Sequence, residues 1–398
     1  MSANKNQATS LALFCKVVDN YGDIGICWRL ARQLHHEHGI SVTLWVDDLQ
    51  SFRRICPEVM VGVDVQEVAG VTARHWRDQD GEFGTGDVAD VVIEFFGCDI
   101  PPGYIAAMAQ CSPRPVWLNL EGLSAEAWVE GCHALPSSHP RLPLTKYFFF
   151  PGFTNKTGGL LHEASLEAER RRFQSDPSAS AAFLSRFGVS AEEMDSLKVS
   201  LFCYGHAPVS ALFDQWRNGD TPVTCFVPEG VAAAAVQAFF GEEANAGAVC
   251  ARGELTVRIL PFIAQPDYDK LLWACDLNFV RGEDSFVRAQ WAGKAFIWHI
   301  YPQDENLHHV KLRAFLNRYA AKLPSARELS LYWNGAPAES VDAQPGLPKL
   351  WRCFKDSLPA IADRADEWRG QVLEHGDLAS NMMKFVRSLQ SVTAENNV

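Results

Sequence analysis

The first half of the chain alternates short, almost uninterrupted apolar runs with polar or helix-like segments. Strands that are covered on both faces have such runs, whereas a strand with one wet face alternates apolar and polar residues. The pattern predicts buried strands at residues 10–18, 42–48, 63–68, 90–97, 115–123 and 146–153. Between the first two, Ile24–His38 carries apolar residues at helical spacing, and Gly39 marks the helix end. This order favours a parallel sheet flanked by helices.

A second series of the same kind begins at Leu197. It predicts strands at 197–205, 221–230, 255–262, 275–282 and 295–302, with helical segments between them. The stretch 154–195 differs, because it is polar and carries a charged, helix-like piece. A long helical segment at 361–389 could pack on either half.

These patterns predict an α/β protein with two Rossmann-like, doubly wound domains, and a length of 398 residues fits two domains. The predicted N-terminal domain comprises residues 1–153 and a C-terminal helix at about 366–390. Residues 154–195 form a linker region, and residues 196–365 form the C-terminal domain. Ligands of such sheets bind at the carboxyl ends of the strands. We therefore expect the domains to face each other across a cleft, with the loop Asp19–Gly25 on one wall.

Composition and charge disfavour several classes of protein. The formal charge of −12 disfavours non-specific nucleic-acid binding, which needs clustered Lys and Arg. None of the eleven cysteines belongs to a Cys-x-x-Cys pair, and most lie in apolar runs, which favours free thiols in a reducing compartment. No apolar run approaches the ~18 residues of a membrane span, and the N-terminus has no apolar signal segment. We expect a cytoplasmic protein with no direct nucleic-acid partner and no membrane partner.

Signatures of dinucleotide and metal binding are missing from the sequence. The turn after the first strand has Gly22-x-x-Gly25 instead of Gly-x-Gly-x-x-Gly, and there is no Walker sequence, which disfavours a dehydrogenase. The clustered histidines have no Cys, Asp or Glu at ligand spacing, and they are His35, His36, His38, His308 and His309. We expect no metal site.

Two aspartates stand where the first strand turns into the first helix, in the stretch "DNYGDIG". Asp23 precedes the predicted helix and could be its N-cap, a purely structural role. Alternatively, Asp19 and Asp23 could do chemistry at the carboxyl end of the sheet. The residues alone do not separate these two interpretations.

The second polar loop, "RGEDS" at 281–285, follows a very apolar strand. Asp284 and Ser285 would lie at a helix N-terminus, where backbone N–H groups and the helix dipole favour a phosphate. Arg281 offers a fork of donors suited to a diphosphate, and Glu283 an acceptor for ribose or sugar hydroxyls. The alternative is an ordinary surface loop with a Ser or Asp cap.

This second loop and its surroundings look like the nucleotide-sugar half of GT-B glycosyltransferases. Three stretches together, residues 14–34, 146–161 and 280–303, resemble the EarP family of bacterial protein-arginine rhamnosyltransferases. The resemblance runs from about Leu11 to Leu389. It implies a GT-B fold and an inverting, metal-independent transfer of L-rhamnose from dTDP-β-L-rhamnose, a substrate, with no cofactor. The implied acceptor is an arginine in the N-terminal domain of elongation factor P, which the modification activates to rescue ribosomes stalled at polyproline.

The resemblance also implies roles for particular residues. Asp19, Asp23 and Glu283 match the family's catalytic positions, with Asp23 as the base candidate. The implied donor- and nucleotide-binding residues are Phe202, Tyr204, Phe262, Gln265, Arg281, Glu283, Asp284 and Ser285. On this view the first half binds the acceptor protein and the second half binds the donor.

Two other functions remain open at this point. One is a GT-B nucleotide-sugar transferase with a different acceptor, which would need an apolar or aromatic groove; the carboxylates of the first loop favour a cationic acceptor instead. The other is a non-catalytic module that binds a nucleotide sugar or a translation factor.

Overall fold

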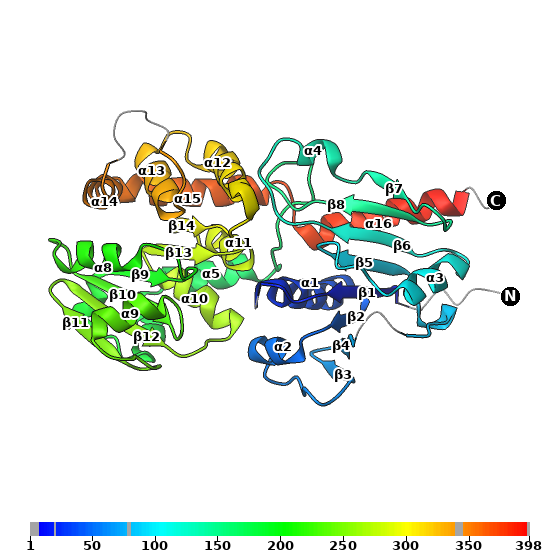
Figure 1. The fold of residues 1–398 in the computed structure, drawn as a ribbon, viewed down its shortest axis with the longest axis horizontal. Helices are drawn as coiled ribbons and strands as arrows, with labels where there is room; N and C mark the ends of the chain where they lie inside the picture. Colours follow the sequence, from blue (N-terminus) through cyan, green and yellow to red (C-terminus); the bar gives the residue numbers. More distant parts are fainter. Residues whose placement is uncertain (1–7, 20, 78–80, 339–344, 396–398) are drawn as a thin grey trace. The chain divides into compact units, whose positions relative to one another are not determined.

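The computed structural model describes residues 8–19, 21–77, 81–338 and 345–395 (Figure 1). The chain divides into two compact units: unit 1 comprises residues 1–164 and 372–398, and unit 2 comprises residues 165–371. The stretch 154–195 is therefore shared between the units. Its unit 2 part forms the helices α5 (Leu166–Ser175), α6 (Pro177–Ser185) and α7 (Ala191–Met194).

Unit 1 is built on an eight-stranded sheet in the order β3-β4-β2-β1-β5-β6-β8-β7. Its strands are β1 (Ser10–Cys15), β2 (Ser41–Val46), β3 (Val65–Val68), β4 (Val71–His75), β5 (Val91–Phe95), β6 (Val116–Leu120), β7 (Pro136–Ser138) and β8 (Thr145–Phe149). Only the edge pairs β3–β4 and β7–β8 of this sheet are antiparallel among the described strands. The predicted parallel sheet is confirmed. The strands β4 and β7, which are short or polar, were not predicted.

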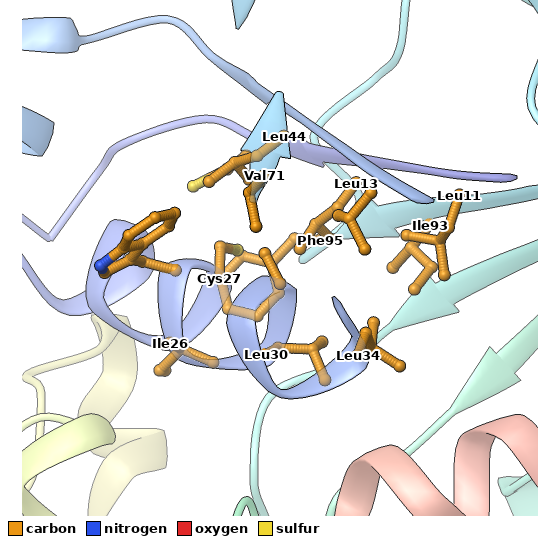
Figure 2. Close-up of a cluster of buried hydrophobic side chains, with 14 of the residues drawn as sticks. Leu11, Leu13, Ile26, Cys27, Leu30, Leu34, Leu44, Val71, Ile93 and Phe95 are labelled. Atoms are coloured by element: carbon orange, nitrogen blue, oxygen red, sulfur yellow. The ribbon is translucent and has the colours of Figure 1, made fainter. Parts of the chain in front are cut away.

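Helices cover both faces of this sheet, which explains why its strands are apolar on both sides. They are α1 (Gly22–His38), α2 (Leu49–Ile55), α3 (Pro102–Gln110), α4 (Val129–Cys132) and α16 (Leu378–Glu395), with a short 3-10 turn η1 (Thr85–Asp87). Leu11 and Leu13 of β1 pack in one core with α1 and α16, and Figure 2 shows them beside Leu30 and Leu34 of α1. Phe14 points the other way, because successive strand residues alternate, and packs with α3.

Unit 2 carries a six-stranded sheet in the order β11-β12-β10-β9-β13-β14. Its strands are β9 (Leu197–Leu201), β10 (Val223–Pro228), β11 (Val249–Arg252), β12 (Leu255–Leu260), β13 (Leu277–Arg281) and β14 (Ala295–His299). Of these, β11 alone runs antiparallel to its neighbour. The further helices are α8 (Val209–Arg217), α9 (Ala233–Phe240), α10 (Gln265–Ala274), α11 (Asp284–Ala292), α12 (Leu307–Tyr319), α13 (Pro324–Trp333) and α14 (Leu347–Asp356), with η2 (Asp304–Asn306).

The predicted last helical segment, 361–389, is two helices, α15 (Leu358–Leu373) and α16. Almost all of α15 belongs to unit 2, and α16 belongs to unit 1. Leu378, Met382 and Val386 of α16 are buried in the same core as α1. The C-terminal helix therefore completes the N-terminal unit, although it is remote in sequence.

All eleven cysteines are free thiols, as their spacing predicted. Burial raises the pKa of the Cys27 and Cys225 thiols well above its usual value, so both remain protonated and unreactive. Within the described residues, no helix is long and apolar enough to span a membrane.

Each sheet has one point where the chain order reverses. In unit 1 the chain moves outward from β1 through β2 to β4 and then restarts on the other side with β5. In unit 2 the corresponding reversal lies between β9 and β13. Ligands of open α/β sheets bind at such points, outside the carboxyl ends of the strands. The loops after β1 and β5, and those after β9 and β13, are therefore where a site is expected.

Candidate active site

The loop after β1 is held together by Asp23. Helix α1 begins at Gly22 with Tyr21 as its N-cap, so of the two interpretations of Asp23 the N-cap role is wrong. Its carboxylate instead reaches back into the loop, where Oδ2 accepts the backbone N–H of Val18 at 2.8 Å and of Asp19 at 2.9 Å. The N-cap interpretation fails because the helical pattern in the sequence starts at Ile24, whereas the helix starts two residues earlier, at Gly22.

Asp23 lies in surroundings that disfavour its negative charge. The residue is 5% exposed, and burial is the main cause that raises the pKa of its carboxyl above the usual value. The two backbone N–H groups oppose this shift, while the carboxylates of Asp19 and Asp47 add to it. A carboxylate with a raised pKa is a better proton acceptor, and it is strongly attracted to a cation.

Asp19 lies against the start of the same helix. The backbone N–H of Gly22 donates to the Asp19 carbonyl at 2.7 Å, and a Cβ at position 22 would lie 3.1 Å from Oδ2 of Asp19. Glycine at this position therefore leaves room for the Asp19 carboxylate. The structure brings the two predicted aspartates together, Asp19 in the loop after β1 and Asp23 in the first turn of α1.

The loop after β5, at the same reversal point, was not predicted as part of a site. Its backbone has positive φ at Phe96 (54°), Gly97 (60°) and Asp99 (56°), which is unusual outside glycine. Two buried side chains hold it: Asn119 accepts the N–H of Gly97 at 2.9 Å, and Glu94 accepts that of Asp99 at 3.1 Å. A carboxylate within the apolar run "VVIEFF" was the only local signal in the sequence.

In unit 2, the structure gathers three of the predicted donor residues at the β9–β13 reversal. Arg281 ends β13, and its guanidinium carbon lies 4.2 Å from the ring centroid of Phe202 and 5.0 Å from that of Tyr204. Its Nη1 also donates to the Cys203 carbonyl at 3.1 Å. The guanidinium is therefore fixed on an aromatic platform by stacking and by a hydrogen bond.

The "RGEDS" loop forms the turn from β13 into α11. Glu283 is the N-cap residue and makes no side-chain cap bond, so the alternative of a Ser or Asp cap is wrong. The Ser285 hydroxyl accepts the Arg281 N–H at 3.0 Å and donates to the Arg281 carbonyl. Asp284 accepts from Nε of Arg288 at 2.9 Å. The side chains of Ser285 and Asp284 thus stabilise the turn, and the start of α11 offers backbone N–H groups.

Ser285→Ala is expected to lower the free energy of unfolding by about 1–3 kcal/mol, because it removes both hydrogen bonds that close the turn around Arg281. Chemical denaturation measures this change. Ser185→Ala is the control: its exposed hydroxyl donates to one backbone carbonyl, of Ala182, at 2.8 Å. Loss of that bond should cost less than about 0.5 kcal/mol. Equal stability of the two variants would contradict the structural role of Ser285.

Phe262 and Gln265 follow β12 and lie apart from the Arg281 platform in the sheet order. Phe262 is 48% exposed and lines a pocket of about 690 Å³ with Ile263, Arg186 and Asp267, among others. Gln265 is the first residue of α10. Tyr268 of the same helix connects this segment to the platform through an edge contact with Phe202, at 6.0 Å between ring centroids.

Sequence reasoning missed two histidines beside Tyr204. His299, the last residue of β14, is completely buried, and its Nδ1 accepts the backbone N–H of Tyr204 at 3.2 Å. The Nε2 atoms of His299 and His206 are 2.9 Å apart. A histidine inside the apolar run "AFIWHIYP" was the available signal. Across the described residues, no group of three or more His, Cys, Asp or Glu side chains is placed to hold a metal ion.

Comparison with known families identifies the family of this chain. The family described as "Elongation-Factor P (EF-P) rhamnosyltransferase EarP" matches residues 11–387, nearly the whole chain. The chain belongs to the EarP family. The resemblance found in the three sequence stretches is thereby confirmed, and the family match extends over both units.

Relatives of this EarP chain are named protein-arginine rhamnosyltransferases. The relative from Pseudomonas putida is 46% identical over 379 residues, which cover 94% of this chain and 98% of the relative. The one from Pseudomonas aeruginosa is 46% identical over 94% of this chain and 97% of its own length. That from Shewanella oneidensis is 39% identical over 97% and 100%. The chain is therefore a glycosyltransferase, a protein-arginine rhamnosyltransferase.

A solved EarP structure supports the same fold. It comes from a study of EarP-mediated arginine glycosylation of translation elongation factor EF-P and superimposes with a TM-score of 0.65. The two chains are 33% identical, with 95% of this chain and 99% of the other covered. A glycosyltransferase from Rickettsia africae shares the fold at 9% identity, with a TM-score of 0.51 and 98% of both chains covered. The predicted GT-B-like α/β fold is confirmed.

Proposed function

We propose that this enzyme transfers L-rhamnose from dTDP-β-L-rhamnose to one arginine side chain in the N-terminal domain of elongation factor P, with inversion at the anomeric carbon. The observation that carries the proposal is the buried Asp23 carboxylate, whose pKa is raised beside Asp19 and Asp47. Such a group suits an acceptor that is itself a cation. The EarP relatives support the choice of sugar and of acceptor.

The acceptor guanidinium has a pKa above ~12, so it arrives protonated and is a poor nucleophile. In our proposal Asp19 and Asp23 hold its planar fork and direct one nitrogen toward the sugar. Asp23 takes a proton as the new bond forms. A neutral imidazole would give no charge attraction to this cation, which favours carboxylates over histidine here.

The donor occupies unit 2 in this proposal. The arginine nitrogen attacks the anomeric carbon, the bond from that carbon to the β-phosphate oxygen breaks, and dTDP leaves with the electron pair. Arg281 and the N-terminus of α11 stabilise the negative charge that develops, while Glu283 binds ribose or sugar hydroxyls. These groups act in place of a metal ion, and no cofactor takes part. Attack opposite to the leaving group converts the β-linkage into an α-linkage, with no covalent enzyme intermediate.

The reaction brings together an acceptor held by unit 1 and a donor held by unit 2. Phe202, Tyr204, Phe262 and Gln265 are proposed to line the nucleotide. We also infer that the enzyme acts in the cytoplasm, because eleven unpaired cysteines suit a reducing compartment. There the modified factor would rescue ribosomes that are stalled at polyproline.

One assay tests the proposal. The purified enzyme is mixed with dTDP-β-L-rhamnose and unmodified elongation factor P, and the intact mass of the factor is measured. We expect the addition of one deoxyhexose, and no addition to a factor whose target arginine is replaced by lysine. NMR of the modified peptide should show an α-linked sugar. No mass change would refute the donor–acceptor pair, and a β-linkage would refute inversion.

A further inference from the structure

His299 and His206 form a brace behind Tyr204, in the loop that follows β9. The His299 ring is buried, and its centroid lies 5.3 Å from the Tyr204 ring and 4.5 Å from the His206 ring. The rings of His206 and Tyr204 are nearly parallel, at 4° and with centroids 6.2 Å apart. Two hydrogen bonds connect the three residues, from Tyr204 N–H to His299 and between the two imidazoles.

The hydrogen bonds fix the protonation of both imidazoles. Nδ1 of His299 accepts the Tyr204 N–H, so its lone pair is occupied and the proton of the neutral ring is on Nε2. That Nε2–H donates to Nε2 of His206, which lies 2.9 Å away and must be unprotonated. The remaining proton of a neutral His206 is then on Nδ1. Burial, assisted by His206 and Arg281, lowers the pKa of His299 to about 3, which keeps this ring neutral.

The brace also reaches the Arg281 side of the site. The sheet order is β9-β13-β14, so His299 on β14 contacts the loop after β9 across the end of β13. His299 and Arg281 are register partners, and the His299 carbonyl accepts the N–H of Gly282 at 3.1 Å. One buried residue therefore holds both segments that meet at the reversal point, the Tyr204 loop through its ring and the "RGEDS" turn through its backbone.

We propose that His299 is a positioning residue for the sugar-nucleotide donor. Through Nδ1 and through His206, it holds Tyr204 where this ring supports Arg281 for binding of the donor diphosphate. This inference rests on the proposed function, because it takes the donor site to be at the β9–β13 reversal. It assigns the histidines no contact with the reacting atoms and no proton transfer in the reaction.

A pair of substitutions separates the two hydrogen bonds of His299. In His299→Asn, the amide oxygen lies where Nδ1 was and still accepts the Tyr204 N–H, whereas in His299→Gln the amide group reaches the Nε2 position and loses that bond. The dissociation constant for dTDP is expected to rise about tenfold in His299→Gln and much less in His299→Asn. The donor KM should follow the dissociation constant, and kcat at saturating donor should change less.

His206, the exposed partner of His299, supplies a second pair of substitutions, and these do not change the buried core. His206→Gln keeps an acceptor for the Nε2–H of His299, and His206→Leu removes it. We expect a rise of about threefold in the dTDP dissociation constant for His206→Leu only. The inference is overturned if both pairs bind dTDP like the wild type. It is also overturned if His299→Asn and His299→Gln lose affinity for dTDP equally, and if this loss follows the fall in their melting temperatures.

Failure of the proposed donor gives a different result. Wild-type enzyme that does not bind dTDP but binds UDP or GDP would refute dTDP-β-L-rhamnose as the donor. The same four variants are then compared with the nucleotide that binds. A tenfold loss confined to His299→Gln would still support the brace, and unchanged binding would overturn it.

Discussion

Asp23→Asn is expected to lower the rate of rhamnosyl transfer by about 10²–10⁴-fold without lowering the melting temperature. The amide oxygen of asparagine can accept the N–H groups of Val18 and Asp19, as Oδ2 of Asp23 does at 2.8 and 2.9 Å. The loop therefore keeps its shape. What the variant loses is the negative charge and the ability to take a proton from the guanidinium.

The raised pKa of Asp23 fixes the sign of its effect on stability. A carboxyl whose pKa is higher in the folded than in the unfolded protein stabilises the fold at pH values below its unfolded pKa. This contribution is lost as the pH rises through the raised folded pKa. At neutral pH the wild type therefore bears the cost of a buried charge near Asp19 and Asp47, and the asparagine variant does not. Thermal unfolding should show an equal or higher melting temperature for Asp23→Asn.

The same shift affects the pH dependence of transfer by the wild type. Only the ionised carboxylate can act as base, so activity should fall on acidification through a pKa that is higher than that of an ordinary aspartate. A pH profile of kcat/KM for the acceptor measures this acid limb. An acid limb at the usual aspartate pKa would show that Asp23 is not the titrating base in the free enzyme.

Asp48→Asn is the matched control for Asp23→Asn. Asp48 also accepts two backbone N–H groups at the start of a helix: its Oδ1 accepts the N–H of Gln50 at 2.9 Å and of Ser51 at 3.1 Å. Burial acts to raise the pKa of its carboxyl, but the hydrogen bonds from Ser51 and Gln50 together outweigh burial and lower this pKa. The Asp48 side chain caps α2. Asp48→Asn should keep nearly full transfer activity. Normal turnover by Asp23→Asn would contradict the base assignment.

The elements of the fold could largely be predicted, because buried parallel strands leave long apolar runs in the sequence. Prediction of element ends was weaker: α1 begins at Gly22, where neither Tyr21 nor Gly22 is a typical start signal. A side chain that reaches backwards, as Asp23 does to Val18, looks in the sequence like an ordinary helix cap. The sequence therefore indicated that Asp23 could act structurally or chemically, but not that its carboxylate binds the backbone of Val18 and Asp19.

Contacts that depend on the sheet order could not be predicted from local pattern. Phe202 and Arg281 are far apart in sequence, and they meet only because β9 and β13 are neighbours. The same is true of Tyr204 and His299, which are linked across β13. Ser285 shows a different limit. A serine at a helix start suggests a hydrogen-bond donor to a phosphate, but the Ser285 hydroxyl is hydrogen-bonded to the Arg281 backbone.

Arg281→Lys is expected to weaken donor binding by about 10- to 100-fold, although it keeps the positive charge. The guanidinium carbon lies over the rings of Phe202 and Tyr204, 4.2 Å and 5.0 Å from their centroids, and Nη1 donates to the Cys203 carbonyl at 3.1 Å. A lysine ammonium has neither the flat surface nor the fork, so it would lose the stacking and would not bind two phosphate oxygens at once. Isothermal titration with dTDP measures the loss.

Arg252→Lys separates this effect from a general cost of replacing a stacked arginine. Arg252 likewise lies over an aromatic ring, 5.4 Å from the Phe239 centroid, and its Nη2 donates to the Phe240 carbonyl at 3.0 Å. It ends β11, the edge strand of the same sheet, away from the β9–β13 reversal. Arg252→Lys should bind dTDP like the wild type.

Because Arg281 is proposed to stabilise the leaving diphosphate as well as to bind it, kcat should fall together with donor affinity in Arg281→Lys. A variant with weaker binding and unchanged kcat would restrict Arg281 to ground-state binding, and one with wild-type affinity would contradict its place in the donor site.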